Sequence, residues 1–105
     1  MTPAIEVRML DRGDPTDRAE WLALWNVWPE REVFAHPDYA ALQARAKDRV
    51  FCATARTPTG GILFPFLLRP LAAEPWAEPG ESAWDLVSPY GYGGAFAWNL
   101  SLIHI

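Results

Sequence analysis

Arg49-Val-Phe-Cys-Ala-Thr-Ala-Arg-Thr-Pro-Thr-Gly-Gly-Ile-Leu-Phe-Pro-Phe-Leu-Leu68 decides the fold, because two apolar runs flank a short polar turn. The first run, 49–55, is typical of a strand, and 57–61 has the length of a hairpin loop. The second run, 62–68, is almost continuously apolar, which predicts a strand buried on both faces. Pro65 has no backbone N–H, so we expect it at a bulge or on a free edge. The stretch therefore predicts an antiparallel hairpin.

One strand and two helices are predicted before this hairpin. Residues 5–10 alternate in polarity as a strand does, and a polar turn follows at 11–15. Asp17 and Glu20 have the spacing of a capping box at the start of a helix. The side chains that share one face of this helix favour core packing over a ligand cage. They are Trp21, Leu22, Trp25 and Trp28.

The first helix is expected to end at Pro29, and a second is expected over 37–47. Pro37 suits the first turn of that helix. After the hairpin, 71–80 is typical of a crossing loop and Trp84 opens a further strand. The predicted order is therefore β-α-α-β-β-β, an α/β protein with a mixed α+β sheet.

The last predicted strand runs into a turn, Trp84-Asp-Leu-Val-Ser-Pro-Tyr-Gly-Tyr-Gly-Gly94. Its glycines permit a positive φ or a close approach of the backbone to a ligand, and its tyrosines offer flat faces with hydroxyl tips. This pattern suits a binding rim, and it is equally compatible with a glycine-rich loop whose tyrosines lean on the core. The candidate substrate-binding residues are Ser88, Tyr90, Gly91, Tyr92 and Gly93.

Asp85-Leu-Val-Ser-Pro-Tyr-Gly-Tyr-Gly-Gly94 resembles a segment of bacterial GNAT and FemAB-like N-acyltransferases. Gly60–Pro70 is similar to the family strand that carries a Pro-Phe pair and ends on an Arg. Phe34–Tyr39 is similar to the segment that opens a family helix. The resemblance spans about 33–94 and departs at Ala95, where the family usually has Pro. It implies a partial GNAT-like acyl-CoA N-acyltransferase fold.

The resemblance also implies an activity, the transfer of an acyl or aminoacyl group from acyl-CoA or aminoacyl-tRNA to an amine. Its acceptor would be a small-molecule or peptidoglycan-type amine. The family's pyrophosphate signature, Arg or Gln followed by x-x-Gly-x-Gly or Ala, does not occur in the sequence. We therefore expect acyl-CoA to be a co-substrate of a larger parent protein, with no cofactor-binding residue in this chain and no activity of the chain alone.

A different class of function stays open, a non-catalytic α/β binding module linked to cell-surface polymer assembly. The two classes differ in one sequence feature. A pyrophosphate signature opening a helix downstream favours the enzyme, and its absence from the whole gene favours the module.

The expected organisation is the N-terminal part of a single domain over 1–99, followed by a non-native tail over 100–105. Leu100-Ser-Leu-Ile-His-Ile105 resembles one reading frame of the mosaic-end adapter used in transposase-based sequencing libraries. The alternative is a genuine short terminal strand, because its apolar residues alternate suitably.

Composition excludes several classes of partner. Of 105 residues, 50% are hydrophobic and the net charge is −4 with no basic run, which argues against binding to DNA or any other nucleic acid. The longest apolar run, 62–68, is far shorter than the ~20 residues of a membrane span. Met1 to Leu10 lacks the pattern of a secretory signal, and one cysteine suits a reducing compartment, so a cytoplasmic location is expected. Six tryptophans need partners, and we expect some to be exposed.

Single candidates for chemistry are weak. His36 precedes a helix-opening Pro and is expected to be a cap or surface residue more than a general base. Cys52 lies in an apolar strand, where a buried thiol is inert. Asp85 is compatible with pairing to a substrate amine and equally with a turn at the strand end, and His104 lies in the suspect tail. Two histidines and one cysteine have no metal-ligand spacing, so no metal is expected.

Overall fold

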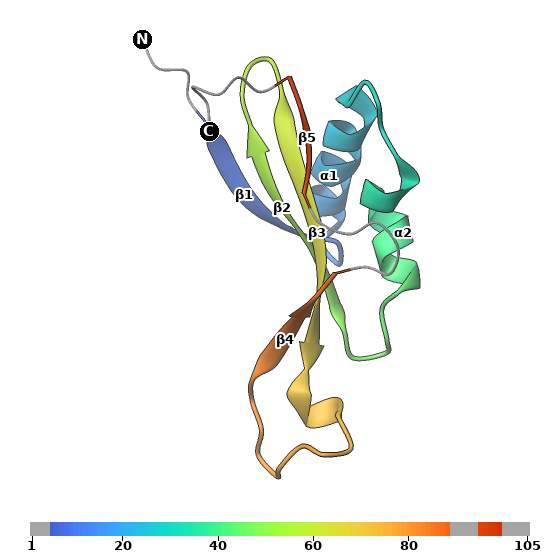
Figure 1. Ribbon diagram of the computed structural model, residues 1–105, viewed down its shortest axis with the longest axis vertical. Coiled ribbons are helices and arrows are strands. Elements are labelled where there is room, and N and C mark those ends of the chain that lie inside the picture. The colour runs from blue at the N-terminus through green and yellow to red at the C-terminus, as the bar shows by residue number, and fades with distance from the viewer. Residues whose placement is uncertain (1–4, 89–94, 100–105) are drawn as a thin grey trace.

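Two helices pack on one face of an antiparallel sheet in the computed structural model, which describes residues 5–88 and 95–99 (Figure 1). Within these residues the sheet has five strands. The elements are β1 (Glu6–Asp11), α1 (Pro15–Val27), α2 (Pro37–Leu42), β2 (Arg49–Arg56), β3 (Gly61–Pro70), β4 (Trp84–Val87) and β5 (Phe96–Trp98), with 3-10 turns at Val33–Ala35 and Leu71–Ala73. The predicted order is confirmed as far as β4, and β5 is an addition that the sequence pattern did not predict.

The predicted hairpin forms the centre of the sheet. Strands lie in the order β1-β2-β3-β4, all antiparallel, and β5 also pairs with β3. In the register of the hairpin Cys52 lies opposite Pro65. The N–H of Thr57 donates to the carbonyl oxygen of Gly60 at 3.0 Å, which closes the turn.

Alternate residues of the strands point toward the helices and form the core. On β2 and β3 the buried residues occur every second position, at Val50, Cys52 and Thr54 and at Leu63, Pro65 and Leu67. Leu10 of β1 lies opposite Cys52 and is also fully buried. The residues between them are only partly buried apart from Phe66, so the prediction that β3 is buried on both faces holds fully for one face alone.

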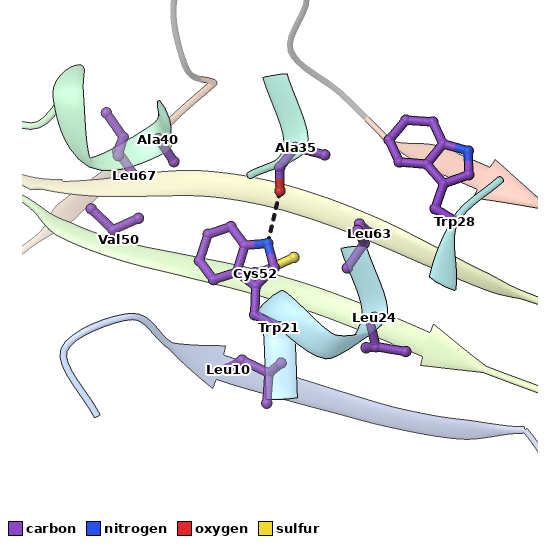
Figure 2. Packing of buried hydrophobic residues seen from close by; sticks show 10 residues of the cluster. All are labelled: Leu10, Trp21, Leu24, Trp28, Ala35, Ala40, Val50, Cys52, Leu63 and Leu67. Atoms are coloured by element: carbon purple, nitrogen blue, oxygen red, sulfur yellow. Dashed lines mark hydrogen bonds between the residues drawn. The ribbon is translucent and has the colours of Figure 1, made fainter. Parts of the chain in front are cut away.

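The tryptophans of α1 pack into this core, as predicted (Figure 2). Trp21 is fully buried, and its Nε1–H donates to the carbonyl oxygen of Ala35 at 2.8 Å. Trp28 lies 5.3 Å from the ring of Phe96 and stacks on Trp98 at 6.0 Å. Helix α1 therefore joins the 3-10 turn at 33–35 to one face of the sheet and fixes β5 on it.

Two predicted helix boundaries are wrong. The cap of α1 is Asp14, whose carboxylate accepts the N–H groups of Thr16 and Asp17 at 2.8 and 3.2 Å. The side chain of Asp17 instead accepts the N–H of Asp11 at 3.0 Å, so it is not part of a capping box. Helix α2 ends at Leu42, short of the predicted residue 47.

Candidate functional site

The candidate site is an interruption in the pairing along one edge of β3. Strand β4 pairs with Leu67 through Val87, and β5 pairs with Leu63 through Phe96. If the register of β4 continued along β3, Leu63 would lie opposite residue 91, but it lies opposite Phe96. The chain therefore has five extra residues between the two paired segments. Because β2 occupies the other edge of β3, both strands lie on the same edge. Neither pairs with β3 at 64–66.

Pro65 lies in the middle of this interruption. Hydrogen-bonded and non-hydrogen-bonded residue pairs alternate along an antiparallel ladder. The 3.0 Å bond from the N–H of Thr57 to the carbonyl of Gly60 marks a hydrogen-bonded pair, so Cys52 and Pro65 form a non-hydrogen-bonded pair. The backbone groups of Pro65 therefore point away from β2. The bond from the N–H of Leu71 to the carbonyl of Ala83, 3.0 Å, shows the same alternation along β4. The sequence predicts a bulge or a free edge for Pro65; within the described residues it lies between the segments of β3 that pair with β4 and β5, so neither of these strands requires an N–H from it. On this edge Pro65 presents a carbonyl oxygen and no N–H.

Ser88 follows the last residue of β4 and is exposed. It stands where the pairing of β4 with β3 ends. The other four candidate residues, Tyr90, Gly91, Tyr92 and Gly93, lie outside the described residues. The proposed rim is thus located at one end by Ser88, between the last pair of β4 and the first pair of β5.

Asp85 lies within β4 opposite Arg69, so the interpretation of Asp85 as a turn residue is wrong. Its side chain is exposed. Arg69 binds Asp48 instead, donating from Nη2 at 3.0 Å and from Nε at 3.2 Å to the same carboxylate oxygen. Burial of Asp48 opposes its ionisation, but the hydrogen bonds from Arg69 and from the Arg45 N–H outweigh that effect and lower the pKa of this carboxyl. This pair anchors the end of β3 to the segment after α2.

Cys52 and His36 occupy the structural roles that the sequence predicts. Cys52 is fully buried, and burial raises the pKa of its thiol to about 12. His36 is the cap of α2, since its Nδ1 accepts the N–H of Asp38 at 3.0 Å. The His36 ring also meets Trp25 edge-on at 4.8 Å. Neither side chain contributes to the interruption on β3, and His104 lies outside the described residues.

A cluster of two arginines on Asp38 joins the loop after β1 to both helices. Arg18 donates to both carboxylate oxygens of Asp38, at 2.9 and 2.7 Å from Nη2, and Arg12 donates at 2.9 Å. The hydrogen bond from Arg18 is the main cause that lowers the pKa of Asp38, burial opposes it, and Arg12 adds to the lowering. One carboxylate is shared by two guanidinium groups, and these bonds join three segments of the chain, which indicates a structural role.

The helix N-termini do not fit the pyrophosphate of coenzyme A. Such a site needs free backbone N–H groups and a positive local field at the start of a helix. At α1 the carboxylate of Asp14 occupies the N–H groups of the first turn and adds negative charge. At α2 the Nδ1 atom of His36 accepts the N–H of Asp38 and so occupies a backbone donor of the first turn. Residues 5–88 and 95–99 therefore contain no helix start suited to this group.

A surface hollow of about 400 Å³ lies between α1, the hairpin turn and β5, and sequence reasoning missed it. Its apolar side comes from Leu24, Val27 and Trp98, and its polar side includes Arg56 and Thr59. The hollow depends on β5 pairing with Gly61, a contact between distant parts of the chain that no local pattern indicates.

Two kinds of site are not found in the described part of the chain. It contains no group of three or more His, Cys, Asp or Glu side chains arranged to hold a metal ion. None of its helices is long and apolar enough to cross a membrane.

No protein-family model, curated protein or solved structure matches this chain. The fold class therefore rests on the structure itself. The acyltransferase interpretation rests on the motif over 85–94, of which the structure describes Asp85–Ser88.

Proposed function

We propose that this chain is part of an N-acyltransferase and carries a portion of the rim that binds its amine acceptor. One observation carries the proposal. The motif that resembles the acyltransferase family, 85–94, begins in β4 and spans the point at which the pairing of β3 steps by five residues. Within the described residues neither β4 nor β5 pairs with β3 at 64–66, so the backbone groups of β3 on this side have no strand partner there and favour a binding role.

The chemistry of Pro65 supports an amine at this place. In acyl transfer the nitrogen lone pair of a neutral amine forms a bond to the acyl carbonyl carbon, the bond to the leaving group breaks, and the amine gives up a proton. A carbonyl acceptor orients an amine because amines carry N–H donors. Pro65 carries a carbonyl oxygen here and no donor; the residue is fully buried, so the exposed end of the proposed rim is Ser88. Donors to the developing oxyanion then have to come from another segment.

The acyl donor is assigned to a part of the protein beyond the described residues. Both helix starts are already capped, by Asp14 and by His36, so acyl-CoA has no place for its pyrophosphate on them. We therefore derive no step through coenzyme A from this chain. The proposed contribution of these residues is to bind and orient the acceptor.

The first experiment is to sequence the source DNA across the codons that follow Trp98. The proposal expects an open frame that continues into a second acyltransferase half. The protein encoded by that frame is then assayed for acylation of amines, with acetyl-CoA as the donor and thiol release as the readout. A gene that ends at Ile105, or a longer protein without acyl transfer from acetyl-CoA or aminoacyl-tRNA, would contradict the proposal.

A matched pair of serine substitutions tests the position of the rim in that longer protein. We expect Ser88→Ala to raise KM for the amine about 3- to 10-fold, equivalent to the ~1 kcal/mol of one hydrogen bond. Ser82→Ala removes the same hydroxyl from an exposed residue before β4 and is expected to change nothing. Equal effects of the two substitutions on KM would place the acceptor elsewhere.

The second candidate function is a non-catalytic binding module, and one observation favours it. Within the described residues the single cysteine is buried, so its thiol is not available as a nucleophile, and the single histidine has a structural role as a helix cap. A longer gene product that binds an amine ligand without any acyl transfer would support this candidate.

A further inference from the structure

The sheet face opposite the helices is apolar and has no helix over it in the part of the chain that the structure describes (Figure 1). We call it the second face. Its apolar side chains include Val7, Met9, Phe51, Ala53, Ala55, Ile62, Phe64, Phe66, Leu68, Trp84, Leu86 and Ala97. Val7 is 73% exposed, Met9 58% and Leu86 54%. Contiguous apolar surface of this kind on a folded chain marks an interaction site.

Two oppositely charged side chains lie at one end of the second face and neutralise each other. Arg49 and Asp11 form an ion pair of 2.9 Å, and the guanidinium of Arg49 lies 4.8 Å from the ring centre of Phe51. The remaining positions of the face are uncharged. A charged partner such as a nucleic acid or an acidic peptide gains nothing on such a surface. Two copies of it meet without like-charge repulsion, although each chain carries a net charge of −4.

Large and small side chains alternate in two rows of the face. One row runs from Met9 through Ala53 to Phe64, because these residues are paired across β1, β2 and β3. The next row has the same order, Val7, Ala55 and Ile62. Each row thus places a small residue of β2 between two large ones, and a twofold rotation sets the large residues of one copy over the small residues of the other. Stacked sheets interdigitate in this way at a separation of ~10 Å.

The aromatic residues beside these rows are already ordered. Phe51 and Phe66 are stacked with ring centres 5.8 Å apart, and Phe64 lies 6.1 Å from Phe66. A surface whose rings are fixed by their own contacts loses little side-chain entropy when it is covered.

We propose that the second face is a homodimer interface, in which the sheets of two copies of this chain pack face to face. The five described strands hold 31 residues, and at ~4.8 Å between strands and ~3.3 Å along a strand they give a footprint of roughly 500 Å² in plan. This is of the order of the ~800 Å² of accessible surface that each partner buries in a standard stable interface. The proposed dimer is independent of acyl transfer, because it uses the face of the sheet and not the edge of β3.

The test is sedimentation equilibrium of the 105-residue chain, with loading concentrations from about 1 to 100 μM. The expected mass is twice the 11.8 kDa of one chain. Val7→Lys places a charge on the face at an exposed position and is expected to weaken the dimer at least 10-fold. Val27→Lys is the matched control, since Val27 is 63% exposed on α1, on the other side of the sheet. We expect it to leave the dissociation constant unchanged.

Circular dichroism of both variants separates a lost interface from a lost fold. A second exposed position of the face gives a second readout. Met9 is 58% exposed, and Met9→Lys is expected to weaken the dimer as Val7→Lys does. A monomeric wild-type chain at 100 μM, larger aggregates in place of a dimer, or equal weakening by Val7→Lys and Val27→Lys would overturn the proposal. A dissociation constant that Met9→Lys leaves unchanged would also overturn it.

Discussion

Trp21→Phe tests how much one buried hydrogen bond contributes to this fold. The Trp21 ring is fully buried, and its Nε1–H donates to the Ala35 carbonyl at 2.8 Å (Figure 2). Phenylalanine keeps an aromatic ring but removes the donor, so the Ala35 carbonyl is left buried and unpaired. An unpaired buried group costs ~1–3 kcal/mol. The smaller ring adds about 1 kcal/mol through the space it leaves, and we expect a total loss of roughly 2–4 kcal/mol.

Trp25→Phe is the matched control. The Trp25 Nε1–H also donates to a backbone carbonyl, that of Glu32 at 2.7 Å, but this bond is exposed. Water replaces the lost donor there, so the free energy of unfolding should fall by less than about 1 kcal/mol. The two substitutions remove the same atoms, and burial is the principal difference between them.

The assay is urea unfolding followed by circular dichroism, with all variants at one protein concentration because dimerisation makes the apparent stability depend on it. Linear extrapolation to water gives the free energy of unfolding of each variant. The expected result is that Trp21→Phe loses at least about 1 kcal/mol more than Trp25→Phe. Equal losses would refute the reasoning, because they would show that burial of the indole N–H contributes nothing measurable.

Two further predictions concern titratable groups. Asp48→Asn should lower the free energy of unfolding by ~3 kcal/mol at pH 7, because it leaves the guanidinium of Arg69 without its carboxylate. The folded-state pKa of Asp48 is lowered, so the stabilisation from its carboxylate is present above about pH 4 and is lost as pH falls through the folded pKa. The difference in free energy of unfolding between wild type and Asp48→Asn should therefore narrow below about pH 4 in acid titrations. A constant difference would contradict this. Cys52, with a pKa of about 12, should react with an aromatic disulfide reagent at pH 8 at least ~100-fold more slowly than the exposed thiol of Leu42→Cys. Similar rates, followed by absorbance, would show that β2 opens readily.

Local patterns predicted the parts of the fold that depend on neighbours in the sequence. The hairpin of β2 and β3 follows from two apolar runs around a short turn, and the burial of Trp21 follows from helical spacing. Pro37 begins α2 as its fixed φ suggests, and His36 caps that helix. In each case the residues that decide the structure lie within one turn or one strand.

The errors come from contacts between distant residues. Asp17 bonds the N–H of Asp11 across the turn from β1, which removes it from the cap of α1. Asp14 before Pro15 is the local signal that the prediction passed over, since Pro favours the first helical position. Helix α2 stops early where the following segment binds Asp48 to Arg69. Such pairs are specified by the tertiary fold and not by periodicity.

The candidate site shows the same limit. Its composition is visible in the sequence, because Gly, Pro and Tyr cluster after an apolar strand. Its position is not, because the five-residue step appears only when β4 and β5 are both placed on β3, and β5 is a three-residue strand whose pairing partner lies more than thirty residues away. Pro65 combines a signal visible in the sequence, its missing N–H, with a position that depends on the pairing of β4 and β5. A residue without an N–H is tolerated in the middle of a ten-residue strand because neither β4 nor β5 requires a donor there.

The proposed acceptor rim uses the edge of β3, whereas the proposed dimer uses the second face of the sheet. Separate substitutions can therefore test the two proposals. Along β3 the backbone of odd-numbered residues faces β4 and β5, whereas the side chains of even-numbered residues form the second face. A change at Ser88 therefore alters the edge without altering the face, and Val7→Lys alters the face from β1 without touching the edge. If Val7→Lys abolished dimerisation and left KM for the amine unchanged in the longer protein, the dimer would have no role in binding the acceptor. If it changed both, the rim would have to include residues from the partner, and the site at Pro65 would be incomplete in a single copy.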